Sequence, residues 1–203
     1  MRRTDRHWLT LAVIGVLAVS GCFSAAYGQS SGFGSGIYHP GQLKPTDSGT
    51  TVKTTDQAPD FILPSISGNK VTLGEFRGKK NVVLSFVPAA WTPVCSQQWP
   101  GYNIAKDIFD TTDAVLIGIS VDNIPTLYAW TKQMGELWFP VVSDFWPHGG
   151  VAKSYGVLRD DGTTERALFI IDKQGIIRYI DVHDINTMPK LEDLAKELEK
   201  LQK

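Results

Sequence analysis

Short runs of consecutive apolar residues recur along the chain from about residue 56, separated by stretches with a helical pattern. Apolar runs of this length, rich in branched side chains, are typical of strands buried on both faces. Three of them predict buried strands: residues 81–87, 114–121 and 167–171. Residues 61–63 and 71–73 predict a short leading hairpin, and the turn at 172–175 predicts an antiparallel partner strand over residues 176–180.

The intervals between the strands predict four helices: residues 93–109, 125–134, 151–155 and 189–201. The last carries leucines at spacings of three and four, which form one apolar stripe suited to packing on a sheet. Pro100 lies inside the first and predicts a kink there. The order of strands and helices predicts an α/β domain with a mixed central sheet flanked by helices on both faces, the arrangement of the thioredoxin-like fold.

The first 22 residues have a different pattern. Three arginines precede an apolar run over residues 8–19, which is too short to span a bilayer comfortably, since that takes about 20 apolar residues. A basic start, a short apolar stretch and small residues predict an export signal over residues 1–21. The run ends in Val19-Ser20-Gly21-Cys22, which resembles the lipobox of bacterial lipoproteins.

A lipobox implies that Cys22 is lipidated and becomes the mature N-terminus. We therefore expect an extracytoplasmic, membrane-anchored lipoprotein in the periplasm or at the cell surface. An ordinary cleaved signal, with an unrelated cysteine beside it, and an uncleaved anchor are the alternatives. Residues 22–55 are rich in Ser, Gly, Gln and Thr, which predicts a flexible tether followed by one domain over residues 56–203.

Composition narrows the functional classes. The chain has 203 residues, of which 42% are hydrophobic and 20% charged, as in soluble globular proteins. Its net charge of −1 provides no basic field for nucleic acid, so no nucleic-acid partner is expected. Of its two cysteines, lipidation would consume Cys22 and leave Cys95 as the one thiol of the mature protein. No zinc-type spacing and no glycine-rich phosphate loop occurs, so we expect neither a metal nor a cofactor.

The segment from Pro88 to Cys95 directly follows a predicted buried strand and opens a predicted helix. Thr92 is suited to cap that helix and Pro93 to occupy its first position, which would place Cys95 in the first turn. There the unpaired N–H groups, such as those of residues 94 and 95, and the helix dipole favour an anion. The segment therefore favours the thiolate of Cys95, which is the reactive form.

Pro88, Thr92 and Cys95 match the peroxiredoxin signature P-x-x-x-T-x-x-C in spacing. Three further segments resemble the family in the same order: residues 58–61, 144–149 and 166–172. The stretch from Ser143 to Val157 is most similar to the one-cysteine branch that includes the AhpE-type enzymes. The chain is thus identified as a member of the peroxiredoxins, and the resemblance implies a thiol-dependent peroxidase that reduces hydrogen peroxide or organic hydroperoxides.

The resemblance also implies a role for each matching residue. Cys95 would attack the peroxide O–O bond, and Thr92 would hydrogen-bond the sulfur and the peroxide oxygen. Arg166 would hold the thiolate and stabilise charge on the departing oxygen. Pro88 would shield the site from water, and the backbone N–H groups of Val94 and Cys95 would help to bind the substrate.

Without a second cysteine in the domain, recycling needs an external thiol, either a small molecule or a thioredoxin-like protein. Family members associate, so we also expect a weak homodimer. One departure is Gln98, where the family often has glutamate; an amide loses a charge partner for arginine.

Two other functions compete with the peroxidase. A thioredoxin-like thiol-disulfide exchange protein would carry a first cysteine where this chain has Thr92, and exchange normally uses that cysteine as the nucleophile. A redox-sensing or inactive scaffold lipoprotein is the non-enzymatic alternative.

Overall fold

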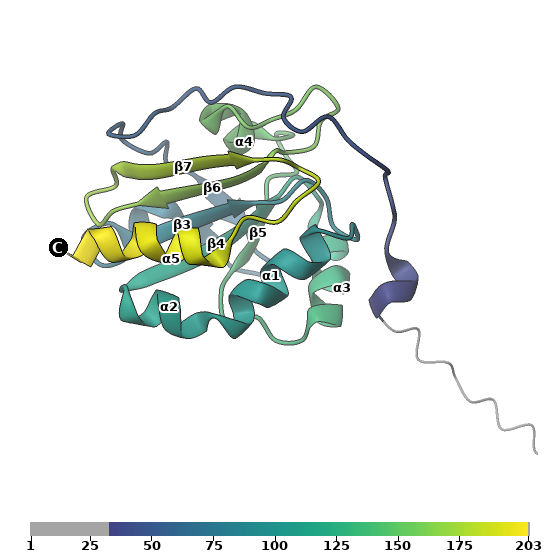
Figure 1. The fold of residues 1–203 in the computed structure, drawn as a ribbon, viewed down its shortest axis with the longest axis horizontal. Helices are drawn as coiled ribbons and strands as arrows, with labels where there is room; N and C mark the ends of the chain where they lie inside the picture. The colour runs from purple at the N-terminus through teal and green to yellow at the C-terminus, as the bar shows by residue number, and fades with distance from the viewer. Residues whose placement is uncertain (1–32, 203) are drawn as a thin grey trace, which may run out of the picture. The chain divides into compact units, whose positions relative to one another are not determined.

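The computed structural model describes residues 33–202, which are built around a five-stranded sheet (Figure 1). Its strands are β3 (Asn81–Phe86), β4 (Ala114–Ser120), β5 (Val141–Ser143), β6 (Arg166–Ile171) and β7 (Ile177–His183). They lie in the order β5-β4-β3-β6-β7; β3, β4 and β5 are mutually parallel, β6 is antiparallel to β3, and β7 is antiparallel to β6. This mixed sheet confirms the predicted thioredoxin-like α/β fold.

Helices cover both faces of the sheet (Figure 1). One face carries α1 (Cys95–Ile104), α2 (Lys106–Thr111), α3 (Ile124–Met134) and α5 (Leu191–Glu199). The other carries α4 (Gly150–Tyr155) and the antiparallel hairpin of β1 (Ile62–Pro64) and β2 (Lys70–Thr72). Three short 3-10 helices complete the described chain: η1 (Phe33–Gly36), η2 (Leu73–Phe76) and η3 (Lys200–Gln202). Within residues 33–202, no helix has the length and apolar composition needed to cross a membrane.

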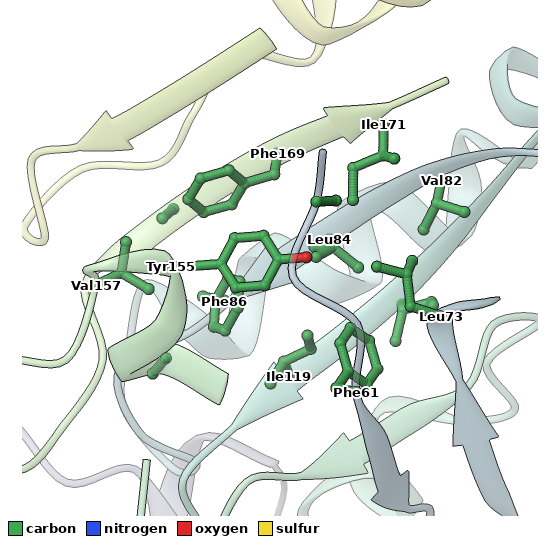
Figure 2. Close-up of a cluster of buried hydrophobic side chains, with 14 of the residues drawn as sticks. Phe61, Leu73, Val82, Leu84, Phe86, Ile119, Tyr155, Val157, Phe169 and Ile171 are labelled. Atoms are coloured by element: carbon green, nitrogen blue, oxygen red, sulfur yellow. The ribbon is translucent and has the colours of Figure 1, made fainter. Parts of the chain in front are cut away.

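Two apolar clusters fill the space on either side of the sheet. Because successive side chains of a strand point to opposite faces, Phe86 and Phe169 join the cluster under α4, which Figure 2 shows around Tyr155. Ring contacts link these three aromatic side chains, with centroids 4.9 to 5.8 Å apart. The alternate residues, such as Val83 and Leu168, face α1 and α5. Both faces of the central strands are therefore buried from solvent, as their continuous apolar runs predicted.

The face under α1 is closely packed around Trp99. The indole N–H of Trp99 donates to the Ser85 hydroxyl at 3.2 Å, and its ring lies over Gly118 on β4. A Cβ atom at Gly118 would meet the ring at 2.7 Å, so only glycine fits at this point of the strand. Trp130 packs on the same indole and donates its own N–H to Ser96. These contacts fix α1, and with it the start of the helix, against the sheet.

Two predictions of secondary structure were wrong in detail. The short strand β5 was not predicted, because three residues following a proline give too short a pattern to detect. The helix predicted over residues 93–109 is two helices, α1 and α2, separated at Ala105. Helix α1 runs through Pro100, and the interruption comes five residues later, where Ala105 leaves the helical conformation and its N–H bonds to the Gly101 carbonyl.

The expected tether over residues 22–55 differs from the structure in its later part. Residues 38–56 lie along the domain, held by backbone hydrogen bonds such as those from the Thr51 N–H to Tyr155 and from the Thr55 N–H to Ile177. The Ser- and Gly-rich composition predicted a flexible segment. The order of residues 38–56 was missed because their hydrogen-bond partners are far away in sequence and leave no local pattern. Cys22 and the predicted signal lie outside the described residues.

Candidate active site

The loop of residues 88–94 joins the end of β3 to the start of α1, and internal contacts fix its shape. The Ala90 N–H donates to the carboxylate of Asp122 at 2.7 Å, and the same oxygen accepts from the Ser120 hydroxyl. The Thr92 hydroxyl donates to the Ala89 carbonyl at 2.9 Å. Asp122, which follows β4, thus fixes the loop to the sheet, and Thr92 adds a hydrogen bond inside the loop.

Cys95 is the first residue of α1, and its side chain is fully buried. The predicted position in the first helical turn is therefore correct. The predicted cap was wrong: the Thr92 hydroxyl bonds back to the loop and makes no capping bond, and the residue before the helix is Val94, in helical conformation. The cause lies one residue earlier, since Trp91 has a φ of 62° and turns the chain sharply before Thr92.

Arg166 opens β6, where the alternation of side chains decides which way it points. Ala167 faces the α4 cluster, so Arg166 faces the opposite side, toward α1. One guanidinium nitrogen, NH2, lies 3.4 Å from the Cys95 Sγ, and the other, NH1, donates to the Gln98 Oε1 at 2.5 Å. The Ile185 carbonyl accepts from Nε and NH2. Sheet register and helix start together bring a cysteine and an arginine 71 residues apart into contact.

The contact places a buried positive charge beside the sulfur. Arg166 is only 2% exposed, and among the described residues no carboxylate lies within ion-pair distance of it. A buried cation without a counter-ion costs several kcal/mol, which a neighbouring negative charge offsets. Gln98 and the Ile185 carbonyl are neutral acceptors, and the pKa of Asp184, lowered chiefly by hydrogen bonds from Asn186, is also lowered by the Arg166 charge. Arg166 can therefore stabilise negative charge that forms beside the Cys95 sulfur.

A cleft of about 410 Å³ lies over the buried sulfur. Pro88, Thr92, Val94 and Arg166 border it, so the structure brings all the predicted site residues of the domain to one place. The Cys95 side chain lies beneath this lining and does not itself border the cleft. Of the residues that border the cleft, Arg166 also contacts the sulfur directly.

Three parts of the site were missed from the sequence. Asp122 was not singled out, although its position directly after a buried strand is a signal for a residue near a sheet edge. The Ile185 carbonyl and residues 38–43, which include His39, border the cleft through contacts that no local pattern reveals. The other two histidines of the domain lie elsewhere: His148 bonds to the Gly162 carbonyl, and His183 lies beside Asp181.

Fold and site together define a class of protein: a thioredoxin-like domain whose reactive centre is one cysteine at a helix start, paired with a buried arginine. Dithiol exchange would require a second cysteine close by, and Cys95 is the only cysteine among residues 33–202. The position that an exchange protein would use holds Thr92.

Comparison with known proteins agrees with this class. The sequence matches the AhpC/TSA family over residues 54–180. It is 40% identical over 126 residues to the alkyl hydroperoxide reductase E of Mycobacterium tuberculosis, a match that covers 62% of this chain and 82% of that protein. It is 31% identical over 157 residues to the chloroplastic 2-Cys peroxiredoxin of Hordeum vulgare, covering 72% and 74% of the two chains. The structure is similar to that of the reduced 2-Cys peroxiredoxin of Plasmodium vivax, with a TM-score of 0.70, 28% identity and coverage of 74% and 82%.

The chain therefore belongs to the AhpC/TSA family, the peroxiredoxins. It is a thiol-dependent peroxidase, an oxidoreductase that reduces peroxides, and this activity fits the site better than disulfide exchange does.

Proposed function

We propose that this protein runs a one-cysteine peroxidase cycle on Cys95. The thiolate attacks the terminal oxygen of a hydroperoxide; the S–O bond forms as the O–O bond breaks, and the leaving oxygen takes a proton and departs as water or an alcohol. Cysteine is oxidised to sulfenic acid and the peroxide is reduced. The observation that carries this proposal is the 3.4 Å contact between the Cys95 Sγ and the buried guanidinium of Arg166.

The neighbouring residues take the following roles in this cycle. Arg166 favours the thiolate in the resting enzyme and stabilises the charge that develops on the leaving oxygen. The Thr92 hydroxyl, which borders the cleft, turns toward the peroxide oxygen or the sulfur when substrate is bound. Pro88 keeps one wall of the cleft apolar, and the N–H groups of Val94 and Cys95, at the helix start, orient the peroxide.

An external thiol completes the cycle. It condenses with the sulfenic acid, releasing water and forming a mixed disulfide, and a second thiol then displaces Cys95 in its reduced form. The presence of a single cysteine in the described domain supports this step, as does 40% identity to an alkyl hydroperoxide reductase E. We assign the chain to the one-cysteine, AhpE-like branch, with a small-molecule thiol or a thioredoxin-like protein as reductant.

Mass spectrometry of the full chain tests the cycle. After one equivalent of hydrogen peroxide, we expect a sulfenic acid on Cys95, trapped by a nucleophile specific for that state and returned to the thiol by an added reductant. A Cys95→Ser variant gives the background. A disulfide between Cys95 and Cys22 as the main product would contradict the one-cysteine cycle.

We also propose that residues 1–21 are a lipoprotein signal and that Cys22 carries the lipid, so that the enzyme acts at a membrane surface outside the cytoplasm. The lipobox-like sequence Val19-Ser20-Gly21-Cys22 supports this proposal. In bacterial cells fed a clickable fatty acid, we expect a labelled protein in the membrane fraction. Cys22→Ser should abolish both the label and the membrane association; a wild-type protein without label would contradict the anchor.

A further inference from the structure

The active-site cleft has a second wall that lies outside the family match. Residues 38–43 border the cleft together with the loop of residues 88–94, and the family match begins only at residue 54. We call residues 38–48 the strap. It belongs to the dark blue coil that precedes the hairpin in Figure 1. This wall is thus an addition to the family domain.

A buried ion pair docks the far end of the strap. One carboxylate oxygen of the fully buried Glu165 accepts from the Asp47 N–H at 2.5 Å and the Ser48 N–H at 2.7 Å; the other accepts from Arg159 at 2.6 Å. Arg159 in turn donates to the Lys44 carbonyl at 3.0 Å. Displacing the strap would remove hydrogen bonds from the buried Glu165 carboxylate and the Arg159 guanidinium, which costs free energy. The strap is therefore an integral part of the domain.

Two further contacts fix the strap at the cleft itself. The side-chain amide of Asn186 pairs with the backbone of Leu43: it accepts from the N–H and donates to the carbonyl, both at 2.9 Å. At the other end, the Tyr38 N–H donates to the Trp91 carbonyl at 2.7 Å. Trp91 is the residue with positive φ beside Thr92, so the strap bonds directly to the loop that leads to Cys95.

The cleft that the strap completes is larger and less polar than hydrogen peroxide requires. Its volume of about 410 Å³ exceeds by roughly tenfold the space that a molecule the size of water occupies in the liquid. Its polar lining consists of Thr92 and Arg166 near the sulfur and of His39, Gln42, Asp161, Thr163 and Asn186. The larger part of the lining is apolar and includes Leu43 and Pro40 of the strap. An apolar wall contributes nothing to binding of hydrogen peroxide, whereas it strengthens binding of an organic group by about fourfold for each buried methylene.

We propose that the strap is a specificity-determining wall, which selects hydroperoxides that carry an apolar organic group over hydrogen peroxide. The inference rests on the proposed peroxidase cycle of Cys95. The bonds that change are the same for both substrates: the terminal oxygen goes to sulfur, and the organic group departs as an alcohol. The strap acts on the part of the substrate that does not react.

The test compares cumene hydroperoxide with hydrogen peroxide in single-turnover kinetics of the full chain. A double variant, Tyr38→Ser with Leu43→Ser, removes apolar surface but keeps the backbone bonds that hold the strap. We expect the ratio of the two second-order rate constants, cumene hydroperoxide over hydrogen peroxide, to fall about tenfold, equivalent to about 1.4 kcal/mol. A matched variant, Ile104→Ser with Tyr128→Ser, changes exposed residues away from the cleft and should keep the wild-type ratio.

A second variant guards against a fold defect. Asn186→Ala removes the two hydrogen bonds that hold Leu43 at the cleft while leaving the apolar side chains of the strap. We expect a smaller fall of the ratio in the same direction, with an unchanged circular dichroism spectrum. A ratio that stays at the wild-type value in both strap variants would overturn the inference and leave the peroxidase cycle intact. A wild-type protein that reacts with neither peroxide would overturn both.

Discussion

Replacing Gln98 by glutamate tests the charge balance of the site. Gln98 is fully buried, and its amide accepts from Arg166 and donates to the hydroxyls of Ser85 and Tyr102. A carboxylate fits the same position, because both hydroxyls can rotate to donate; burial raises the pKa of Tyr102, so its hydroxyl stays protonated. The introduced glutamate would pair with Arg166 and compete with the sulfur of Cys95 for the positive charge.

The size of the effect on the Cys95 thiolate follows from two contacts of the Arg166 guanidinium. The carboxylate would occupy the position 2.5 Å from one nitrogen, while the Cys95 sulfur lies 3.4 Å from the other. Two negative charges at these positions would be roughly 6–8 Å apart and would repel each other by about 2–3 kcal/mol at an effective dielectric constant of about 20. Since 1.4 kcal/mol corresponds to a factor of ten, Gln98→Glu should slow reactions of the Cys95 thiolate at neutral pH by up to about 100-fold.

The assay is the rate of alkylation of Cys95 by iodoacetamide at pH 7, in a Cys22→Ser background that leaves one thiol. Gln97→Glu is the matched control, because Gln97 is the exposed neighbour on the same helix and solvent screens its charge. We expect a large fall of the alkylation rate for Gln98→Glu and less than about a threefold fall for the control. A rate that does not change in Gln98→Glu, or that falls equally in both variants, would refute the charge argument.

Three further predictions concern the loop, the core and the surface. Thr92→Val removes a donor that borders the cleft and should slow peroxide reduction about 100-fold in stopped-flow kinetics, whereas Thr92→Ser should recover most of the rate. Gly118→Ala drives a Cβ to 2.7 Å from the Trp99 ring and should lower the free energy of unfolding by about 1–3 kcal/mol; in urea melts, Gly101→Ala, which has open space around it, should not destabilise the protein. Hydrogen bonds from two lysines lower the pKa of Asp113 from 3.8 to about 2, so its contribution to stability is present above pH 4 and is lost as the pH falls toward 2. Asp113→Asn should therefore lower the urea midpoint at pH 7 and match the wild type near pH 2; a difference that is independent of pH would contradict this assignment.

The sequence predicted the centre of the fold and the core of the site well, for physical reasons. A strand such as β3 is buried along its whole length, so its apolar run is unambiguous. The helix start expected at Thr92 and Pro93 placed Cys95 in the first turn, and that position is correct although the cap is not Thr92. Arg166 was expected at the site only from the family resemblance; it lies there because it opens a strand whose pairing with β3 brings its first residue to the same end of the sheet.

The parts that were not predicted depend on contacts between distant residues. The strap has the composition of a linker, and its order comes from buried partners more than 100 residues away, chiefly Glu165 and Asn186. The Thr92 cap failed because the positive φ of Trp91 redirects the hydroxyl, and a tryptophan gives no hint of that conformation. Propensity describes the local chain, whereas these features are set by tertiary structure.

The central claim, that Cys95 reduces peroxide, is tested most directly by mixing the reduced protein with excess hydrogen peroxide and following tryptophan fluorescence in a stopped-flow instrument. Trp99 lies on the same helix as Cys95 and Trp91 in the preceding loop, so both can report oxidation of the sulfur. We predict a fast signal whose rate rises linearly with peroxide concentration and which Cys95→Ser abolishes. A signal that persists in Cys95→Ser, or a reaction no faster than that of a free thiol, would contradict the account.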